Sequence, residues 1–160
     1  MKVFDASSLI HAWDNYPILQ FPGLWNWIKI EAAERRIATP IVAFEEVEHK
    51  TPECGDWLKK NKLVMLPISN MISVHAVKIK KLLGIIGDSY HVNGVGENDI
   101  FIIATAIEHK SILVSEEKRQ INLPGNPAKR KIPAVCAMEG ISVECISFID
   151  FLKRSNEIFH

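Results

Sequence analysis

Three acidic residues occupy positions from which they could act together. Asp5 and Glu117 each stand at the end of a short apolar segment, and Asp99 stands at the start of a longer one. Each acid alone has an ordinary explanation, because a carboxylate at the start of a helix caps it and complements its dipole. All three together are harder to explain in this way. We therefore expect the three to belong to one site.

Clustered carboxylates need positive charge. Two of them about 4 Å apart repel by roughly 4 kcal/mol at an effective dielectric near 20, so a cluster takes up protons or binds cations. Sites built only from oxygen ligands select hard ions such as Mg²⁺ or Mn²⁺, which also accept a phosphate oxygen. Such ions polarise a phosphodiester and activate water. The acids therefore indicate phosphodiester hydrolysis.

A basic segment, residues 118–131, follows Glu117. It contains no acid and five cations, Lys118, Arg119, Lys129, Arg130 and Lys131. The whole chain balances 19 basic against 19 acidic residues, so any nucleic-acid binding must use a local patch. We interpret the basic segment as a contact for the phosphate backbone of RNA. A solvated surface loop explains the same residues equally well.

Short strands alternating with helices should position these residues. We expect strands at 2–5, 63–66, 111–114 and 141–146. Helices are expected at 22–36, from Thr39-Pro40 through the acids near 46, from Thr51-Pro52 to 58, after Ser69, at 97–107, at 133–140 and after Ser147. Ser7 and Ser8 are candidate caps for a helix after the first strand.

This alternation predicts an α/β fold with a parallel sheet. In such sheets a ligand binds beyond the carboxyl ends of the strands, where Asp5 and Glu117 are expected. We expect one domain over residues 1–160, in the cytoplasm. Three cysteines without a CxxC pair favour reduced thiols, and neither a signal peptide nor a membrane span is indicated.

Four passages, in order and covering nearly the whole chain, resemble the PIN-domain family, especially the VapC-type toxin ribonucleases of toxin–antitoxin pairs. They are VFDASSLI, ATPIVAFEEVEHK, ENDIFIIATAIEHKSILVSEEK and KIPAVCAMEGISVECISFIDFLK. The resemblance implies a three-layer α/β/α sandwich with a central parallel sheet. It also implies an endoribonuclease that depends on Mg²⁺ or Mn²⁺, with an antitoxin protein and a second copy of the chain as partners.

The same resemblance assigns the site. Asp5 matches the first acid of the family, Asp99 the third, and Ser7 the small polar residue that helps to hold the site. The second acid precedes an aliphatic residue, which selects Glu46 over Glu45. The fourth follows a strand-ending Ser or Thr by two residues, which selects Glu117 after Ser115. Two further acids are kept as reserve ligands, Glu97 and Glu116.

Two other functions remain to be compared with the nuclease. Many family members have Asp where this chain has Glu117, which motivates a PIN-like module that binds RNA or protein without cutting. A receiver-like phosphotransfer domain is disfavoured, because such domains pair adjacent acids after the first strand and Asp5 has no acidic neighbour.

Overall fold

A five-stranded parallel sheet occupies the centre of the molecule in the computed structural model, which describes all 160 residues. The strands run in the order β3-β2-β1-β4-β5. In register, Val3 pairs with Ala38 on one side and with Leu113 on the other. The strands are β1 (Lys2–Phe4), β2 (Ile37–Pro40), β3 (Val64–Leu66), β4 (Leu113–Val114) and β5 (Cys145–Ile146).

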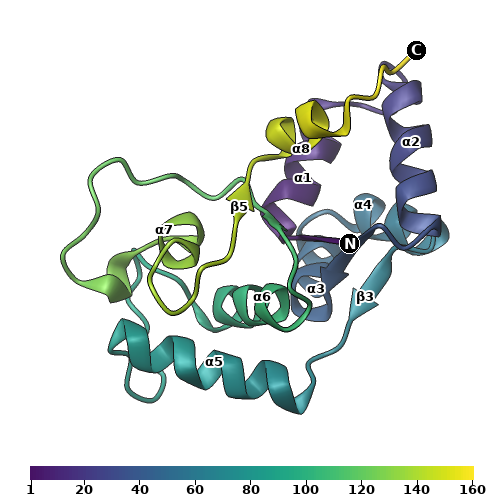
Figure 1. Cartoon of the computed structure of the whole chain (residues 1–160). Helices are drawn as coiled ribbons and strands as arrows, with labels where there is room; N and C mark the ends of the chain where they lie inside the picture. Colours follow the sequence, from purple (N-terminus) through teal and green to yellow (C-terminus); the bar gives the residue numbers. More distant parts are fainter.

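Helices cover both faces of this sheet, as the α/β class predicted from the sequence requires. Helices α5, α6 and α7 lie together on one side, and α1, α2 and α8 lie on the other (Figure 1). Forty buried apolar residues form one continuous core. None of the helices combines the length and the apolar character needed to cross a bilayer. The helices are α1 (Ala6–Asn15), α2 (Pro22–Ala33), α3 (Ile41–Lys50), α4 (Pro52–Lys60), α5 (Asn70–Leu83), α6 (Glu97–Glu108), the short 3₁₀ helix η1 (Pro127–Lys129), α7 (Ile132–Cys136) and α8 (Phe148–Ser155).

Strand β2 is the element that the sequence prediction missed. Thr39-Pro40 was expected to open a helix, but both residues belong to a fully buried central strand, and α3 begins one residue later. The extended backbone of Pro40 suits the end of a strand as well as the entry to a helix. The Thr39 hydroxyl donates to the Phe4 carbonyl at 2.8 Å instead of capping.

Further expectations also need correction. The helix expected at 133–140 ends at Cys136, and the strand expected at 111–114 is reduced to Leu113–Val114. Ser7 and Ser8 do not cap α1, because the helix begins at Ala6 with Asp5 at the N-cap position. The strand expected at 141–146 is reduced to its last two residues, since Ser142 adopts a left-handed backbone with a φ of 52° that interrupts extended pairing. The caps expected from Ser69 and Ser147 are confirmed, since each accepts a backbone N–H of its own helix.

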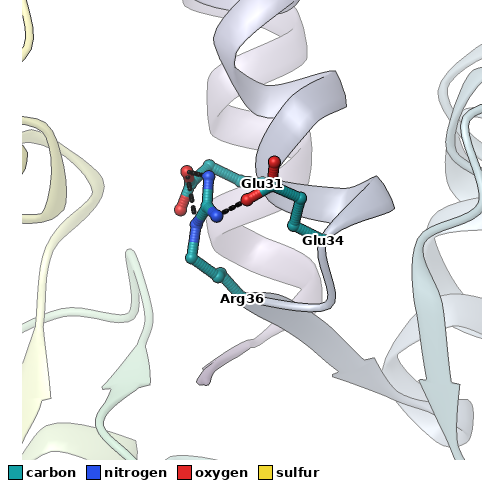
Figure 2. A network of polar contacts seen from close by, with 3 residues as sticks. All are labelled: Glu31, Glu34 and Arg36. Atoms are coloured by element: carbon teal, nitrogen blue, oxygen red, sulfur yellow. Dashed lines mark hydrogen bonds and ion pairs between the residues drawn. The ribbon is translucent and has the colours of Figure 1, made fainter.

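The connection from α2 to β2 is held by an ion-pair network at the edge of the sheet where β1 and β2 begin. Arg36 lies between two acids of the preceding helix and turn (Figure 2). Its Nε and Nη2 donate to one oxygen of Glu31 at 2.9 and 2.6 Å, and its Nη1 pairs with Glu34. The Arg36 carbonyl accepts the Lys2 N–H, so the network also fixes the start of β1.

Two loops on the rim of the sheet pack directly against each other. The Val95 N–H donates to the Arg130 carbonyl at 3.0 Å, which joins the loop before α6 to the basic segment. Gly94 makes this close approach possible, because a Cβ at that position would lie 1.8 Å from the Ala128 carbonyl oxygen. In the Gly94-Val95-Gly96 sequence, Gly94 thus allows the two loops to pack against each other.

Gly94→Ala should therefore destabilise the protein by about 1–3 kcal/mol or more, because the methyl group meets rigid backbone. Chemical denaturation monitored by circular dichroism measures this as a lower midpoint. Gly125→Ala is the matched control, since nothing lies within 4 Å of a Cβ there. An unchanged midpoint for Gly94→Ala would show that the two loops do not pack in this way.

Candidate active site

Asp5 is the structural centre of the candidate site. It directly follows β1, its N–H donates to the Val114 carbonyl of β4, and only 3% of the residue is exposed. Its Oδ2 accepts hydrogen bonds from the Ser7 hydroxyl at 2.6 Å and the Ser115 hydroxyl at 2.9 Å. Its Oδ1 accepts no hydrogen bond from the protein and keeps contact with solvent. One carboxylate oxygen is therefore fixed and the other is free to bind a ligand.

The same two hydroxyls organise the chain after β4. Ser7 Oγ accepts the Glu116 N–H at 2.9 Å, and Ser115 Oγ accepts the Glu117 N–H at 3.1 Å. Both residues therefore join the start of α1 to the end of β4. These bonds place beside Asp5 both Ser7, to which the resemblance gave a supporting role, and Ser115, which precedes Glu117 by two residues.

Asp99 lies in the first turn of α6. Its Oδ2 accepts the Gly96 N–H at 2.9 Å, so the ordinary capping role does apply to this acid. Burial nevertheless raises the pKa of Asp99 to about 6, against the lowering effect of the Gly96 hydrogen bond. The charges of Asp5, Glu117 and Glu46 raise it further. Asp99 thus caps α6 and also belongs to the site.

The four expected acids, Asp5, Glu46, Asp99 and Glu117, are called the acid cluster below, because the charges of the others act on Asp5 or Asp99. Burial raises the pKa of Asp5, hydrogen bonds from Ser7 and Ser115 oppose this, and the charges of Glu117 and Glu46 add to it. Together with the effects on Asp99, these shifts connect acids from four separate segments of the chain. Like charges held together in this way are typical of metal and catalytic sites.

The remaining candidate acids are oriented differently. Glu116 Oε1 accepts the Phe148 N–H at 2.6 Å and so helps to cap α8. Glu45 and Glu97 are exposed residues of α3 and α6. Neither of these two contributes to the pKa shifts of Asp5 or Asp99.

Sequence reasoning missed a cation beside the cluster. Lys50, the last residue of α3, donates from Nζ to Glu46 Oε1 at 2.5 Å. That hydrogen bond raises the pKa of Lys50, and the charges of Asp5 and Glu117 raise it further. The Glu-x-x-x-Lys spacing is the signal that was available, because residues four apart share a helix face.

The five cations of the basic segment are free of acidic partners. None of them forms an ion pair. Arg119 stays beside the end of β4, where its Nη1 contacts the carbonyls of Ser115 and Glu117, each at 3.4 Å. Gln120 holds the segment together by bonding to Lys129 and Lys131 backbone atoms, and Lys118 is exposed. The segment therefore presents unpaired positive charge, and Arg119 brings part of it beside Glu117.

The acid cluster fits a hard divalent cation in ligand type and charge, since it offers only carboxylate and hydroxyl oxygens and carries unbalanced negative charge. It is not a preformed cage. No three His, Cys, Asp or Glu side chains converge closely enough to hold one ion in the present arrangement. Glu46, the acid engaged by Lys50, is turned to a competing cation.

Comparison with known proteins assigns the family. A family model described as "Domain of unknown function (DUF4411)" matches residues 3–159. The chain belongs to the DUF4411 family. No curated protein sequence matches it.

Solved structures resemble this DUF4411 chain in fold. The crystal structure of VapBC2 from Rickettsia felis bound to a DNA fragment from their promoter aligns over 91% of this chain and 97% of that one, with a TM-score of 0.55 and 14% identity. A toxin–antitoxin complex from Klebsiella pneumoniae aligns over 80% and 94%, with a TM-score of 0.48 and 15% identity. The first match confirms the PIN-like α/β fold implied by the sequence resemblance.

The raised pKa of Asp99 predicts a pH dependence of the metal-free protein. Asp99 titrates near 6 when folded and at its ordinary value of 3.8 when unfolded, so the folded state holds the proton more tightly. The stability from this proton is complete below about pH 4 and is lost as the pH rises through about 6.

Asp99→Asn keeps the hydrogen-bond acceptor for Gly96 and removes the charge. In EDTA it should be more stable than wild type at pH 7.5, by up to about 3 kcal/mol, and the difference should nearly vanish at pH 4. Urea denaturation at several pH values measures this. Asp88→Asn, on an exposed loop, is the control. A difference that does not vary with pH would contradict the assignment.

Proposed function

We propose that this chain is a Mg²⁺- or Mn²⁺-dependent endoribonuclease, acting in the cytoplasm as the toxin of a toxin–antitoxin pair. The observation that carries the proposal is that the charges of Glu46 and Glu117 act on both buried acids of the site, Asp5 and Asp99. These acids come from distant segments, and helix capping alone does not account for bringing them together. The PIN-like fold supports the same activity.

Each part of the site has a role in this proposal. When bound, the divalent ion polarises the phosphodiester and lowers the pKa of water. The four acids would hold it, with Asp5 offering its free Oδ1 and Ser7 and Ser115 keeping that carboxylate in position. Glu97 and Glu116 are not among the proposed ligands. This choice follows from the exposure of Glu97 and from the bond between Glu116 and Phe148.

The basic segment would bind the RNA backbone. Its five cations, Lys118, Arg119, Lys129, Arg130 and Lys131, have no acidic partners to displace. Arg119 contacts the carbonyls of Ser115 and Glu117, so a phosphate held by Arg119 would lie beside the acid cluster. The proposed substrate is therefore RNA, which the chain would engage by its backbone.

The toxin assignment rests on the structural resemblance. The matching Rickettsia structure contains VapBC2 with promoter DNA, and the match covers nearly all of this chain. By extension, we propose an antitoxin protein as partner and a homodimer as the assembled form of the toxin.

Purified protein should cut defined RNAs with Mn²⁺ or Mg²⁺ and stop when EDTA is added. Asp99→Asn should lose more than about 100-fold of the rate, because it removes a ligand charge. Glu46→Gln should lose activity similarly, whereas Glu45→Gln, its exposed neighbour on α3, should keep it. Gel analysis of end-labelled RNA measures the cleavage, and circular dichroism checks that each variant folds.

The same variants separate nuclease from binding module. RNA binding without metal-dependent cleavage by the wild type would contradict the enzyme and support a silent PIN-like module. Induced expression of the wild type in bacteria should arrest growth, and Asp99→Asn should not. Growth arrest by both proteins would exclude cleavage as its cause.

A further inference from the structure

One cation is bonded directly to the acid cluster. Lys50 and Glu46 form an ion pair at 2.5 Å, and none of the other three acids, Asp5, Asp99 and Glu117, has an ion-pair partner. The Lys50 side chain is 58% exposed and that of Glu46 is 32% exposed. The pair therefore lies at the mouth of the site, with a path open to solvent for the ammonium group.

This pair differs from an ordinary helix-surface pair. A Lys and a Glu four residues apart stabilise a helix modestly wherever they occur. Lys50, however, also interacts with Asp5 and Glu117, which come from the ends of β1 and β4. The Lys50 charge therefore interacts with Glu46 on its own helix and also with the acids that follow β1 and β4.

The same helix provides a comparison. Glu48 of α3 pairs with Lys59 of α4, whose side chain is 51% exposed. The charges acting on Lys59 are those of Glu48 and Asp56 only. This second pair matches the first in chemistry and exposure, but it has no connection with the acid cluster.

Resting on the proposed function, we infer that Lys50 is the built-in counter-ion of the acid cluster, which a divalent ion must displace from Glu46 in order to bind. Without metal, the ammonium offsets part of the repulsion among the four carboxylates and holds Glu46 to one side. In this arrangement no three acids converge on one point. When the metal binds, Glu46 exchanges one cation for another. Lys50 is a positioning residue that sets the affinity of the site for metal.

Lys50→Met should therefore tighten Mn²⁺ binding roughly tenfold, because it frees Glu46 and removes a charge that repels the incoming ion. Lys50→Arg keeps the charge and should bind Mn²⁺ within about twofold of the wild type. Lys59→Met is the matched control and should leave the affinity unchanged. Isothermal titration calorimetry with Mn²⁺ alone measures each Kd, and no RNA or turnover is needed.

Thermal unfolding gives a second readout. The increase in Tm produced by a fixed Mn²⁺ concentration should be larger for Lys50→Met than for the wild type, because binding to the native state stabilises by mass action. A role of Lys50 limited to holding α3 together would lower the Tm with and without Mn²⁺ equally. It would leave the Kd unchanged.

The outcomes separate the two proposals. If the wild type binds Mn²⁺ and Asp99→Asn binds it more weakly, but Lys50→Met has the wild-type Kd or a weaker one, the inference on Lys50 is wrong and the metal site stands. A similar tightening in Lys59→Met would also overturn the inference, since it would reduce the effect to net charge. If the wild type binds no Mn²⁺ at millimolar concentrations, both proposals fail.

Discussion

The site depends on the burial of one carboxylate. Asp5 lies at the junction of β1, α1 and β4, where two serine hydroxyls hold one of its oxygens. A buried charge is tolerated only when hydrogen bonds or cations compensate it. The serines supply part of that compensation, and in doing so they join the first and fourth strands through the backbone N–H groups after β4. The same hydrogen bonds therefore hold the centre of the sheet together and position the candidate site.

Electrostatic repulsion is the second part of the design. Repulsion among the acids has to be opposed by other contacts, and the Asp5 carboxylate is held by the Ser7 and Ser115 hydroxyls. Asp99 is fixed through the Gly96 N–H, and Glu46 is held by Lys50. The same rigidity that keeps the charges together makes the region a candidate for binding positive ions.

Local patterns predicted most of the architecture, and contacts between distant residues account for what they missed. The strand that leads to Asp5, the caps Ser69 and Ser147, and the acid opening α6 were all correct, because each depends on neighbours in the sequence. Strand β2 was missed because Thr39 bonds to a carbonyl 35 residues away, which no local rule contains. The four acids were selected largely by family resemblance. The Lys50 pair was missed although its spacing of four residues was available in the sequence. The bond of Glu116 to α8 joins residues 32 apart, which no local pattern contains.

The contact between the loop before α6 and the basic segment joins two segments that the proposed function uses. The Val95 N–H donates to the Arg130 carbonyl, and Gly94 packs closely against Ala128. Movement of either segment would therefore disturb the other. The loop before α6 leads into the helix that carries Asp99, and the basic segment supplies cations. A change in the length of either loop would thus alter the distance between Asp99 and the cations of the basic segment. A relative with a longer or shorter version of one loop would therefore need a matching change in the other loop to keep this contact.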